Sequence, residues 1–352
     1  MSTESSGKVK VGIVGAKFAA KLHAESYKRT QKAQLVSVAD IDEEALELFQ
    51  SDFDVETTYS DYSDMLKNED LDVISVCVPN FLHSEVAITA AQSGSHVVCE
   101  KPLATTVEDA ERMVKVASEN DVKLMYAEDW VFAPALIRAT EILNEGGIGD
   151  LLYLRAKESH SGSHSIYAKK LEYCGGGSLI HLGIHPLGFA LSLLGDNIES
   201  VTGVTTGGQA DNLLHGDFEG EDWGLGVLKY SDGKVAQIEA NYVTQGGMDD
   251  VVEMFGTDGV IKVDLTQGSP LRVFSQKGLD YTVEKAKVKS GWSFPAIDEY
   301  SSLGYQGEIE HFVNCVLGKT DLQKGVRGED GLKVIETIKE IYNAAETGDQ
   351  SI

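Results

Sequence analysis

Val9–Gly15, with the sequence VKVGIVG, runs directly into Ala16-Lys17-Phe18-Ala19-Ala20, and this stretch decides the fold of the first part of the chain. An apolar, β-branched run followed at once by a helical pattern predicts a strand, a tight turn and a helix. A dinucleotide-binding turn of this kind has glycine at three positions, which here hold Gly15, Lys17 and Ala20. Ala is tolerated at the third position, but Lys17 replaces the glycine that lets the backbone approach a pyrophosphate.

Two hypotheses remain open for Lys17: its ammonium pairs with a phosphate, or its side chain is a solvated surface group. In both cases the helix that begins near Phe18 and Ala19 offers free N–H groups to an anion. Asp40 ends the next apolar run and is the expected carboxylate for the ribose hydroxyls of adenosine, unless it only caps the helix that follows. A carboxylate repels a 2′-phosphate, so we expect NAD as the cofactor, with NADP second.

Strands and helices continue to alternate as far as residue 128. The further predicted strands are Leu35–Ala39, Val73–Val78, His96–Cys99 and Leu124–Ala127, and the helices are Phe18–Tyr27, one from Asp42, Leu82–Ser93 and Val107–Glu119. Strands that are almost continuously apolar are typical of a parallel sheet covered on both faces. Residues 1–128 are therefore predicted to form a doubly wound α/β domain of the Rossmann type.

Residues 129–352 have a different pattern, which predicts an α+β domain with a large, mostly antiparallel, open sheet. The predicted helices are Ala135–Glu145, Gly175–Gly195, Glu308–Leu317 and Gly328–Ala345, and the strands are Leu151–Lys157, Val201–Thr206, Leu225–Tyr230, Val235–Thr244, Val251–Phe255 and Val260–Leu265. Turns are expected at Ser231-Asp232-Gly233 and Thr257-Asp258-Gly259. The irregular segment Thr266–Tyr305 is expected to be a loop that can cover a site.

The charge of the chain limits its partners. Fifty-six acidic against thirty basic residues give a net charge of −26, which argues against nucleic acid and anionic membrane surfaces. The N-terminus has no apolar core typical of a signal peptide, and no apolar stretch is long enough to span a membrane. Four cysteines without a CxxC pair suggest a reducing compartment. We expect a soluble, cytoplasmic protein.

Three further motifs resemble those of a known family. Val78-Pro79-Asn80-Phe81-Leu82-His83 is similar to a VPNxxH motif, Glu100-Lys101-Pro102 is an EKP motif, and residues 175–185, GGGSLIHLGIH, resemble a GGG…DxxxH helix. These motifs, with the helical segment Glu308–Ala345, resemble the Gfo/Idh/MocA oxidoreductases, the group of glucose–fructose oxidoreductase and inositol dehydrogenase.

The resemblance implies an N-terminal NAD(P) domain and a second domain whose open sheet often forms oligomer interfaces, so a homodimer or homotetramer is expected. It also implies that Lys101 contacts the reacting hydroxyl and that His185 is the acid/base. Both roles suit alcohol oxidation, because a group that titrates near neutrality must take the hydroxyl proton. His181 stands where the family usually has Asp. Without that carboxylate, we expect His185 to have a lower pKa than in its relatives.

The remaining site residues follow from position and chemistry. The predicted cofactor-binding residues are Gly15, Lys17, Phe18, Ala19, Asp40, Pro79, Asn80, His83, Glu100 and Lys101. His83 either caps the helix near Leu82 or lies by the cofactor, while Glu100 is expected to anchor the loop rather than do chemistry. A cis Lys101–Pro102 bond is conceivable.

The predicted substrate-binding residues are Lys101, Trp130, His160, His164, His181 and His185. His181 and His185, four residues apart, are expected on one face of a helix. Three hypotheses remain open for the two histidine pairs and Glu158: they line a sugar pocket, bind a metal or are core residues. We favour a sugar pocket without a metal. Trp130 either stacks on a sugar ring or packs between the domains.

These observations predict an NAD-dependent oxidoreductase acting on a secondary alcohol of a sugar, polyol or sugar derivative. The alternative is redox-neutral glycoside cleavage, elimination or isomerisation through a transient keto-sugar. A third class is a sensor that has lost catalysis, motivated by Lys17 and His181. The negative charge favours a neutral sugar or polyol over a sugar phosphate.

Overall fold

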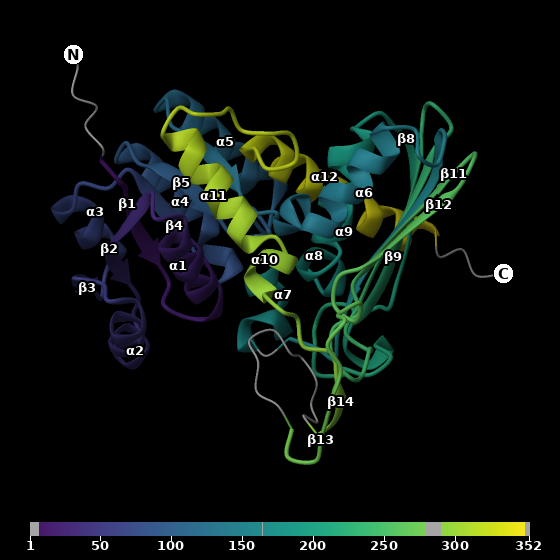
Figure 1. Cartoon of the computed structure of the whole chain (residues 1–352), viewed down its shortest axis with the longest axis horizontal. Coiled ribbons are helices and arrows are strands. Elements are labelled where there is room, and N and C mark those ends of the chain that lie inside the picture. Colours follow the sequence, from purple (N-terminus) through teal and green to yellow (C-terminus); the bar gives the residue numbers. More distant parts are fainter. Residues whose placement is uncertain (1–6, 164, 279–289, 349–352) are drawn as a thin grey trace.

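The computed structural model describes residues 7–163, 165–278 and 290–348. It contains two six-stranded sheets with helices packed between them, and the N- and C-terminal ends lie at opposite sides (Figure 1). The first sheet is built from β1 Val9–Val14, β2 Ala33–Ala39, β3 Thr57–Tyr59, β4 Val73–Val76, β5 His96–Cys99 and β6 Leu124–Tyr126. Its helices are α1 Phe18–Thr30, α2 Glu43–Phe53, α3 Tyr62–Asn68, α4 His83–Gln92 and α5 Val107–Glu119.

This first sheet is entirely parallel in the order β3-β2-β1-β4-β5-β6, so the predicted doubly wound α/β fold is confirmed. All four residues of β4 are buried, because helices cover both faces of the sheet. The prediction missed β3 and α3. β3 has three half-buried residues and α3 buries only Met65, so neither has the apolar periodicity that marks an element in a sequence.

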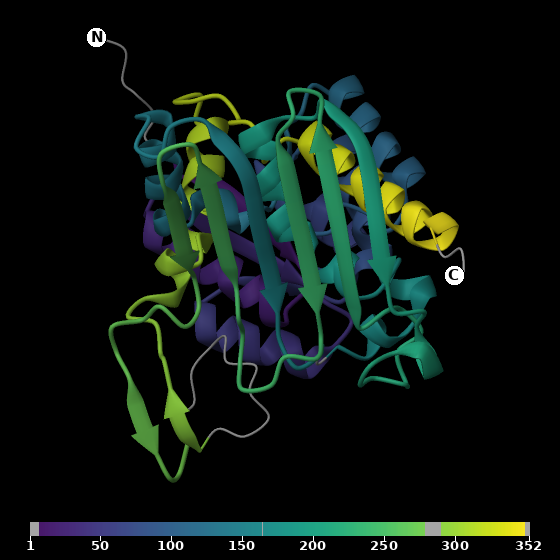
Figure 2. The ribbon, with the colours of Figure 1, turned by 90° about the vertical axis from the view of Figure 1, so that its right-hand side faces the viewer.

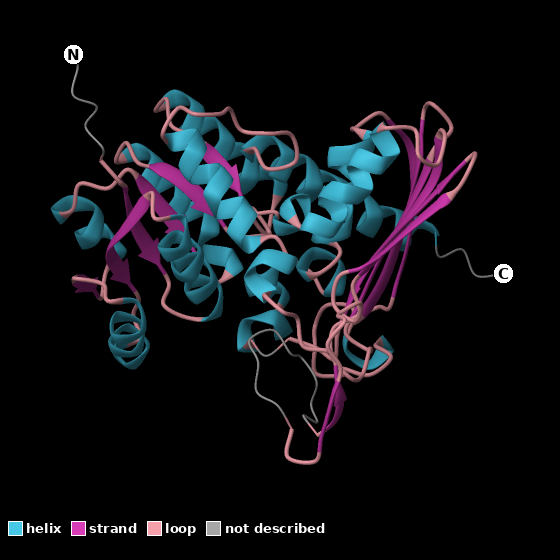
Figure 3. Ribbon diagram, in the orientation of Figure 1, coloured by secondary structure: helices cyan, strands magenta, loops and turns pink. Residues whose placement is uncertain are grey.

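The second sheet is built from β7 Leu151–Ser159, β8 Ile198–Thr205, β9 Trp223–Tyr230, β10 Val235–Asn241, β11 Val251–Gly256 and β12 Val260–Asp264. Its order is β12-β11-β7-β10-β9-β8, and only the central β7–β10 pair is parallel. The predicted mostly antiparallel sheet is therefore confirmed. Burial alternates along β9 and β10, because helices cover one face of the sheet and leave the other open (Figures 2 and 3).

The helices behind this sheet are α6 Pro134–Asn144, α7 Leu171–Cys174, α8 Ser178–His181, α9 Ile184–Leu194 and α12 Gly328–Gly348. The prediction of one helix over Gly175–Gly195 is wrong, because the chain bends by 56° between Leu171–His181 and Ile184–Leu194. Pro186 explains the break: its ring would clash with the carbonyl of Leu182 in a continuous helix, whereas it is tolerated in the first turn of α9.

Short elements complete the chain. They are η1 Asn80–Leu82, η2 Asp129–Phe132, η3 Ile166–Lys169, η4 Gln209–Asp211, β13 Val273–Ser275, β14 Gly291–Ser293 and α10 Glu299–Ser302. β13 and β14 pair within the segment predicted to be an irregular loop, and Phe274 contacts Trp292 across them with ring centroids 5.6 Å apart. Strands of three residues are too short to show a period. Residues 279–289 of that predicted loop lie outside the described residues.

The C-terminal part of the chain returns to the first sheet. α11 Tyr305–Val316 packs beside α1 through Ile309, Phe312 and Val313, which join the core of the parallel sheet. The Tyr126 N–H donates to the Val326 carbonyl at 2.8 Å. Among the described residues no single helix is long and apolar enough to cross a membrane; the bent pair Leu171–His181 and Ile184–Leu194 meets that criterion by length and composition alone.

Candidate active site

The turn after β1 has the geometry of a nucleotide-binding loop. Gly15 has a φ of 103°, and a Cβ on it would lie 2.3 Å from the Cys77 carbonyl oxygen, so only glycine fits. Lys17, in contrast, has a φ of −102°, which any residue adopts. Phe18 is exposed and Ala19 half-buried at the start of α1. The backbone thus accepts a side chain at the position where the motif usually has its second glycine.

Lys17 and Asp40 lie at the end of the loop that borders β2. The Lys17 ammonium is 2.9 Å from Asp42, and this hydrogen-bonded ion pair raises the pKa of Lys17. Asp40 accepts from the Ala16 N–H at 2.7 Å and from the Asp42 N–H at 3.0 Å. The helix-cap alternative for Asp40 is wrong, because Asp42 caps α2 by accepting from the Ala45 N–H. Asp40 instead ties the turn to β2 and keeps lone pairs that can accept from ribose hydroxyls.

Pro79, Asn80 and His83 form the next loop along the sheet. His83 is the first residue of α4 and makes no cap; its ring nitrogens lie 2.7 Å from the Pro102 carbonyl oxygen and 2.9 Å from that of Val78. It therefore joins the Pro79 loop to the loop after β5. The buried Nδ2 of Asn80 has no hydrogen-bond partner among the described residues, which leaves this donor available to a ligand.

Glu100 and Lys101 follow β5, and the Lys101–Pro102 peptide is cis. Glu100 pairs with the His23 ring at 3.0 Å and accepts from the Lys101 N–H at 3.1 Å. Burial raises the pKa of Glu100, but His23 and Lys101 outweigh it and hold the pKa below its usual value. Glu100 thus anchors the loop. The Lys101 side chain extends from the first domain to the second, where its Nζ donates to the His181 carbonyl at 3.0 Å.

His181 and His185 do not lie on one helix face, because His181 ends α8 and His185 lies in the first turn of α9. Burial, aided by the Lys101 ammonium, lowers the pKa of His181 to about 3, so this imidazole is neutral. Its Nε2 has no hydrogen-bond partner among the described residues. Lys101 thus contacts the backbone carbonyl of His181, whose ring packs against Tyr242 with centroids 6.4 Å apart.

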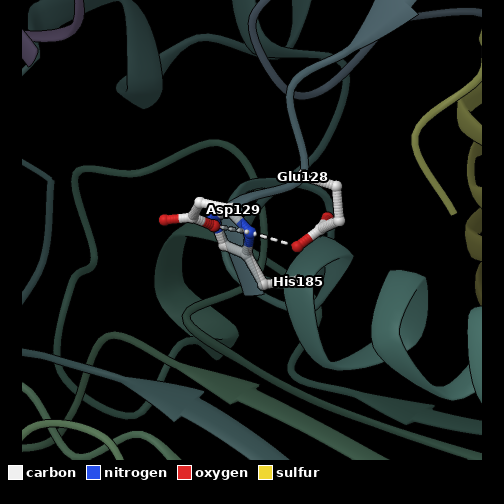
Figure 4. A group of neighbouring side chains, drawn as sticks. All are labelled: Glu128, Asp129 and His185. Carbon is white, nitrogen blue, oxygen red and sulfur yellow. Dashed lines mark hydrogen bonds and ion pairs between the residues drawn. The ribbon is translucent and has the colours of Figure 1, made fainter. Parts of the chain in front are cut away.

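His185 lies among carboxylates (Figure 4). Its Nδ1 is 2.8 Å from Oε1 of Glu128 and 3.0 Å from Oδ1 of Asp129, while Nε2 is 3.9 Å from Oε2 of Glu158. The expectation that His185 has a lower pKa than in its relatives stays a prediction, but relative to the usual histidine value this pKa is raised. Burial and the Lys101 charge lower it, but the Glu128, Asp129 and Glu158 carboxylates together raise the pKa of His185 well above its usual value.

Glu128 and Asp129 are the residues that the sequence reasoning missed. They follow β6, the last parallel strand, and the carboxyl ends of parallel strands are where ligands bind in this fold. Their position just after a parallel strand was the signal in the sequence by which these two site residues could have been found. Burial raises the pKa of Glu128, and the Tyr126 hydroxyl donates a hydrogen bond to the Glu128 carboxyl at 3.3 Å. Half-buried Tyr305 and buried Glu308 of α11, whose pKa values are raised by burial and by the charge of Asp129, were also missed.

The other predicted substrate residues are placed differently. Trp130 is buried and stacks on His185, with centroids 6.0 Å apart and planes at 14°, so it orients that ring. His160 is buried against Tyr242, and its Nδ1 accepts from the Gly162 N–H at 3.0 Å. His164 lies outside the described residues. In the described part of the chain, the group whose ligand atoms converge within 4.8 Å is Glu128, Asp129 and His185, rather than the two histidine pairs.

A nucleotide-binding turn lies at one end of a parallel sheet, and a lysine of the same domain reaches histidines of a second domain. Together these features define a two-domain NAD(P)-dependent oxidoreductase. The family models agree: residues 9–128 match an oxidoreductase family with an NAD-binding Rossmann fold, and residues 136–262 match a GFO/IDH/MocA C-terminal domain. The chain belongs to the Gfo/Idh/MocA family.

Its relatives act on sugars and polyols. The chain is 28% identical to the NADP(+)-dependent D-xylose 1-dehydrogenase of Haloarcula marismortui, over 82% of this chain and 77% of that protein. It is 26% identical to the myo-inositol 2-dehydrogenase of Thermotoga maritima, over 92% of each. The crystal structure of GenD2 from gentamicin A biosynthesis, in complex with NAD, superposes with a TM-score of 0.88 at 25% identity, over 97% of this chain and 95% of that one.

Proposed function

We propose that this protein oxidises a secondary alcohol of a sugar, polyol or sugar derivative with NAD. The observation that carries the proposal is the contact between Lys101 and the His181 carbonyl, because it brings an ammonium from the nucleotide domain to the buried His185 cluster. Sugar and polyol dehydrogenases among its relatives support the same reaction class.

Each residue near the reacting carbon has a distinct task in this proposal. Bound NAD supplies the hydride acceptor. Lys101 holds the hydroxyl and stabilises the developing alkoxide. The hydroxyl proton passes to Nε2 of His185, since Nδ1 is engaged by Glu128, and the carboxylates stabilise the imidazolium that forms. Trp130 holds the ring in this orientation.

The cofactor contacts are assigned from the same geometry. The turn at Gly15, the Asp40 carboxylate and the Asn80 amide are proposed to hold NAD, with Lys17 adding positive charge near the ribose. Phe18, Ala19, Pro79 and His83 shape this surface, and Glu100 supports Lys101.

The test is a screen of sugars and polyols for NADH formation, with mass analysis of the products. The proposal expects NADH and a product two hydrogens lighter than the substrate. Lys101→Ala should lower the turnover by about 100-fold or more. Absence of NAD(H) and NADP(H) binding in calorimetry would contradict the whole assignment. Full turnover by Lys101→Ala would contradict the role given to that lysine.

A redox-neutral reaction through a transient keto-sugar is the second candidate. The observation that favours it is the adjacency of Glu128 and His185, which offer a base and an acid within 2.8 Å of each other. The same mass analysis separates the two candidates. A product formed without accumulation of NADH, and with deuterium exchanged from solvent at carbon, favours elimination or isomerisation.

We also infer a homodimer or homotetramer built on the open face of the second sheet. On this face Tyr153 stacks on Phe255 with centroids 5.4 Å apart, and Val204 and Val260 are exposed. Light scattering after gel filtration tests the assembly, and limited proteolysis tests a domain boundary near residue 128.

We further propose a cytoplasmic protein that binds neither nucleic acid nor membranes, in keeping with its charge of −26.

A further inference from the structure

Four side chains of the first domain form a hydrogen-bonded series that ends at the loop of Lys101. The Tyr27 hydroxyl lies 2.8 Å from the Ser75 hydroxyl, which lies 3.2 Å from Nδ1 of His23. Nε2 of His23 lies 3.0 Å from Oε1 of Glu100, and Oε2 of Glu100 accepts from the Lys101 N–H at 3.1 Å. The series therefore joins α1 and β4 to the loop after β5.

The carboxylate at one end sets the direction of these bonds. Burial raises the pKa of Glu100, but His23 and Lys101 outweigh it and hold the pKa below its usual value, so this group is ionised. An ionised carboxylate only accepts, so Nε2 of His23 donates to Glu100. A ring with its proton on Nε2 accepts at Nδ1 from Ser75, which in turn accepts from Tyr27. Each donor of the series thus has an acceptor.

The series is not a path that carries protons away from the site. It ends at Tyr27, a residue that is 1% exposed and whose pKa is raised by burial. His23 and Ser75 are equally buried, and of the four side chains only that of Glu100, 13% exposed, reaches the accessible surface. A proton that entered at Glu100 would have no exit, so the series is suited to hold Glu100 in place.

Hydrogen bonds hold Glu100 more specifically than apolar packing would. Buried polar groups cost desolvation free energy that apolar side chains of similar size do not, but their bonds have direction. His23 holds one oxygen of Glu100 and the Lys101 N–H holds the other, so the carboxylate cannot rotate without breaking a bond. The Lys101 ammonium in turn donates to the His181 carbonyl at 3.0 Å. The orientation fixed at His23 therefore extends to Lys101.

We propose that His23 is a positioning residue for the reaction: through Glu100 it fixes the backbone of Lys101 and so holds the ammonium at the His181 carbonyl. The inference rests on the proposed function and adds to it a residue that acts through another. A misplacement of about 1 Å in a catalytic group can cost about 100-fold in rate, so loss of the His23 bond should lower kcat. The affinity for NAD should change little, because Gly15 and Asp40 are held by other bonds.

The experiment compares three substitutions of His23. His23→Leu removes the donor to Glu100, His23→Gln keeps an amide N–H near the place of Nε2, and His23→Asn is too short to reach. His23→Leu and His23→Asn should lower kcat by about 10- to 100-fold with the KM for NAD within about twofold, and His23→Gln should recover most of kcat. His96→Leu is the matched control, because half-buried His96 lies at the other end of β5 and accepts from the Lys123 N–H.

A second measurement needs no substrate. The rate at which acetic anhydride acetylates Lys101, followed by mass spectrometry, reports whether its Nζ is held at the His181 carbonyl. Acetylation of Lys101 should be several-fold faster in His23→Leu and His23→Asn than in the wild type. The rate should remain near the wild-type value in His23→Gln and His96→Leu.

The outcomes separate this inference from the function on which it rests. Wild-type kcat in His23→Leu, or a change confined to the KM for NAD, overturns the positioning role and leaves the dehydrogenase intact. A loss in His23→Gln as large as that in His23→Leu also overturns it, because packing of the ring would then matter and its donor would not. If His23→Leu does not fold, equal kcat in His23→Asn and His23→Gln overturns it. No NADH from any sugar or polyol with the wild type removes the proposed function, and the acetylation rates then decide whether His23 holds Lys101.

Discussion

Nδ1 of His185 lies 2.8 Å from Oε1 of Glu128, so the residue at the end of the last parallel strand orients the catalytic candidate of the second domain. The position where the family usually has Asp holds His181, whose imidazole is neutral because burial lowers its pKa. The carboxylate that polarises His185 is thus supplied from a different part of the fold. A carboxylate at this distance fixes the tautomer and stabilises the imidazolium.

Glu128→Gln should change the pH dependence of turnover. Because Glu128 raises the pKa of His185, oxidation in the wild type should increase with pH through a midpoint above 6.5, as His185 loses its proton. The variant should shift that midpoint to lower pH by about one unit or more and reduce kcat by about 10- to 100-fold. The pH profile of kcat/KM measures both effects. Glu141→Gln, on the exposed side of α6, should keep the wild-type profile, and an unshifted profile for Glu128→Gln would contradict the assigned pairing.

Glu221 should make folding stability depend on pH. It accepts from the N–H groups of Gly177 and Leu179 and from the Tyr342 hydroxyl, and burial raises its pKa to about 7. A carboxyl with a raised pKa binds more protons when folded, so its contribution to stability falls as pH rises from about 4.5 through 7, by about 1–3 kcal/mol.

Urea unfolding at pH 5 and pH 8 tests this dependence. The difference in unfolding free energy between the two pH values should be smaller in Glu221→Gln than in the wild type. Glu340→Gln, an exposed residue of α12, serves as the control. An unchanged difference in Glu221→Gln would refute the assigned titration.

Gly15→Ala should destabilise the protein strongly. The substitution places a Cβ 2.3 Å from the Cys77 carbonyl oxygen at a φ of 103°, so both contact and conformation are unfavourable. We expect a loss of about 2–4 kcal/mol and much weaker NAD binding. Gly94→Ala separates the two causes, because Gly94 has a φ of 89° with open space around it and should cost about 1 kcal/mol. Thermal unfolding and calorimetry measure both variants, and equal losses would show that the close approach to Cys77 is unimportant.

Lys17→Met should weaken nucleotide binding in a salt-dependent way. The ion pair with Asp42 is exposed, so the variant should lose less than about 1 kcal/mol of stability. Removing the ammonium should lower the affinity for NADP more than that for NAD, because NADP carries the additional phosphate. Lys21→Met, which removes the pair between Lys21 of α1 and Asp52 of α2, is the control. Calorimetry at low and high salt reports the effect, and identical NADP affinity in the two variants would assign Lys17 to the solvated surface.

Much of the fold could be predicted, because apolar periodicity is a local property. The strands β1, β2, β4, β5 and β6 are runs that a parallel sheet buries on both faces, and the alternation in β9 and β10 reflects a sheet with one open face. The break between α8 and α9 was missed although Pro186 signals it, since the apolar run continues through it.

The sequence by itself determined the family, the nucleotide-binding turn and the identities of Lys101 and His185, because motifs are contiguous residues with a fixed local geometry. Only the tertiary structure decided the environment of His185. Glu128 and Asp129 after β6 meet Glu158 of β7 there, and the pKa of an imidazole depends on the charges and burial around it in space. Burial and the Lys101 charge lower the pKa of His181, while carboxylates from separate elements raise that of His185.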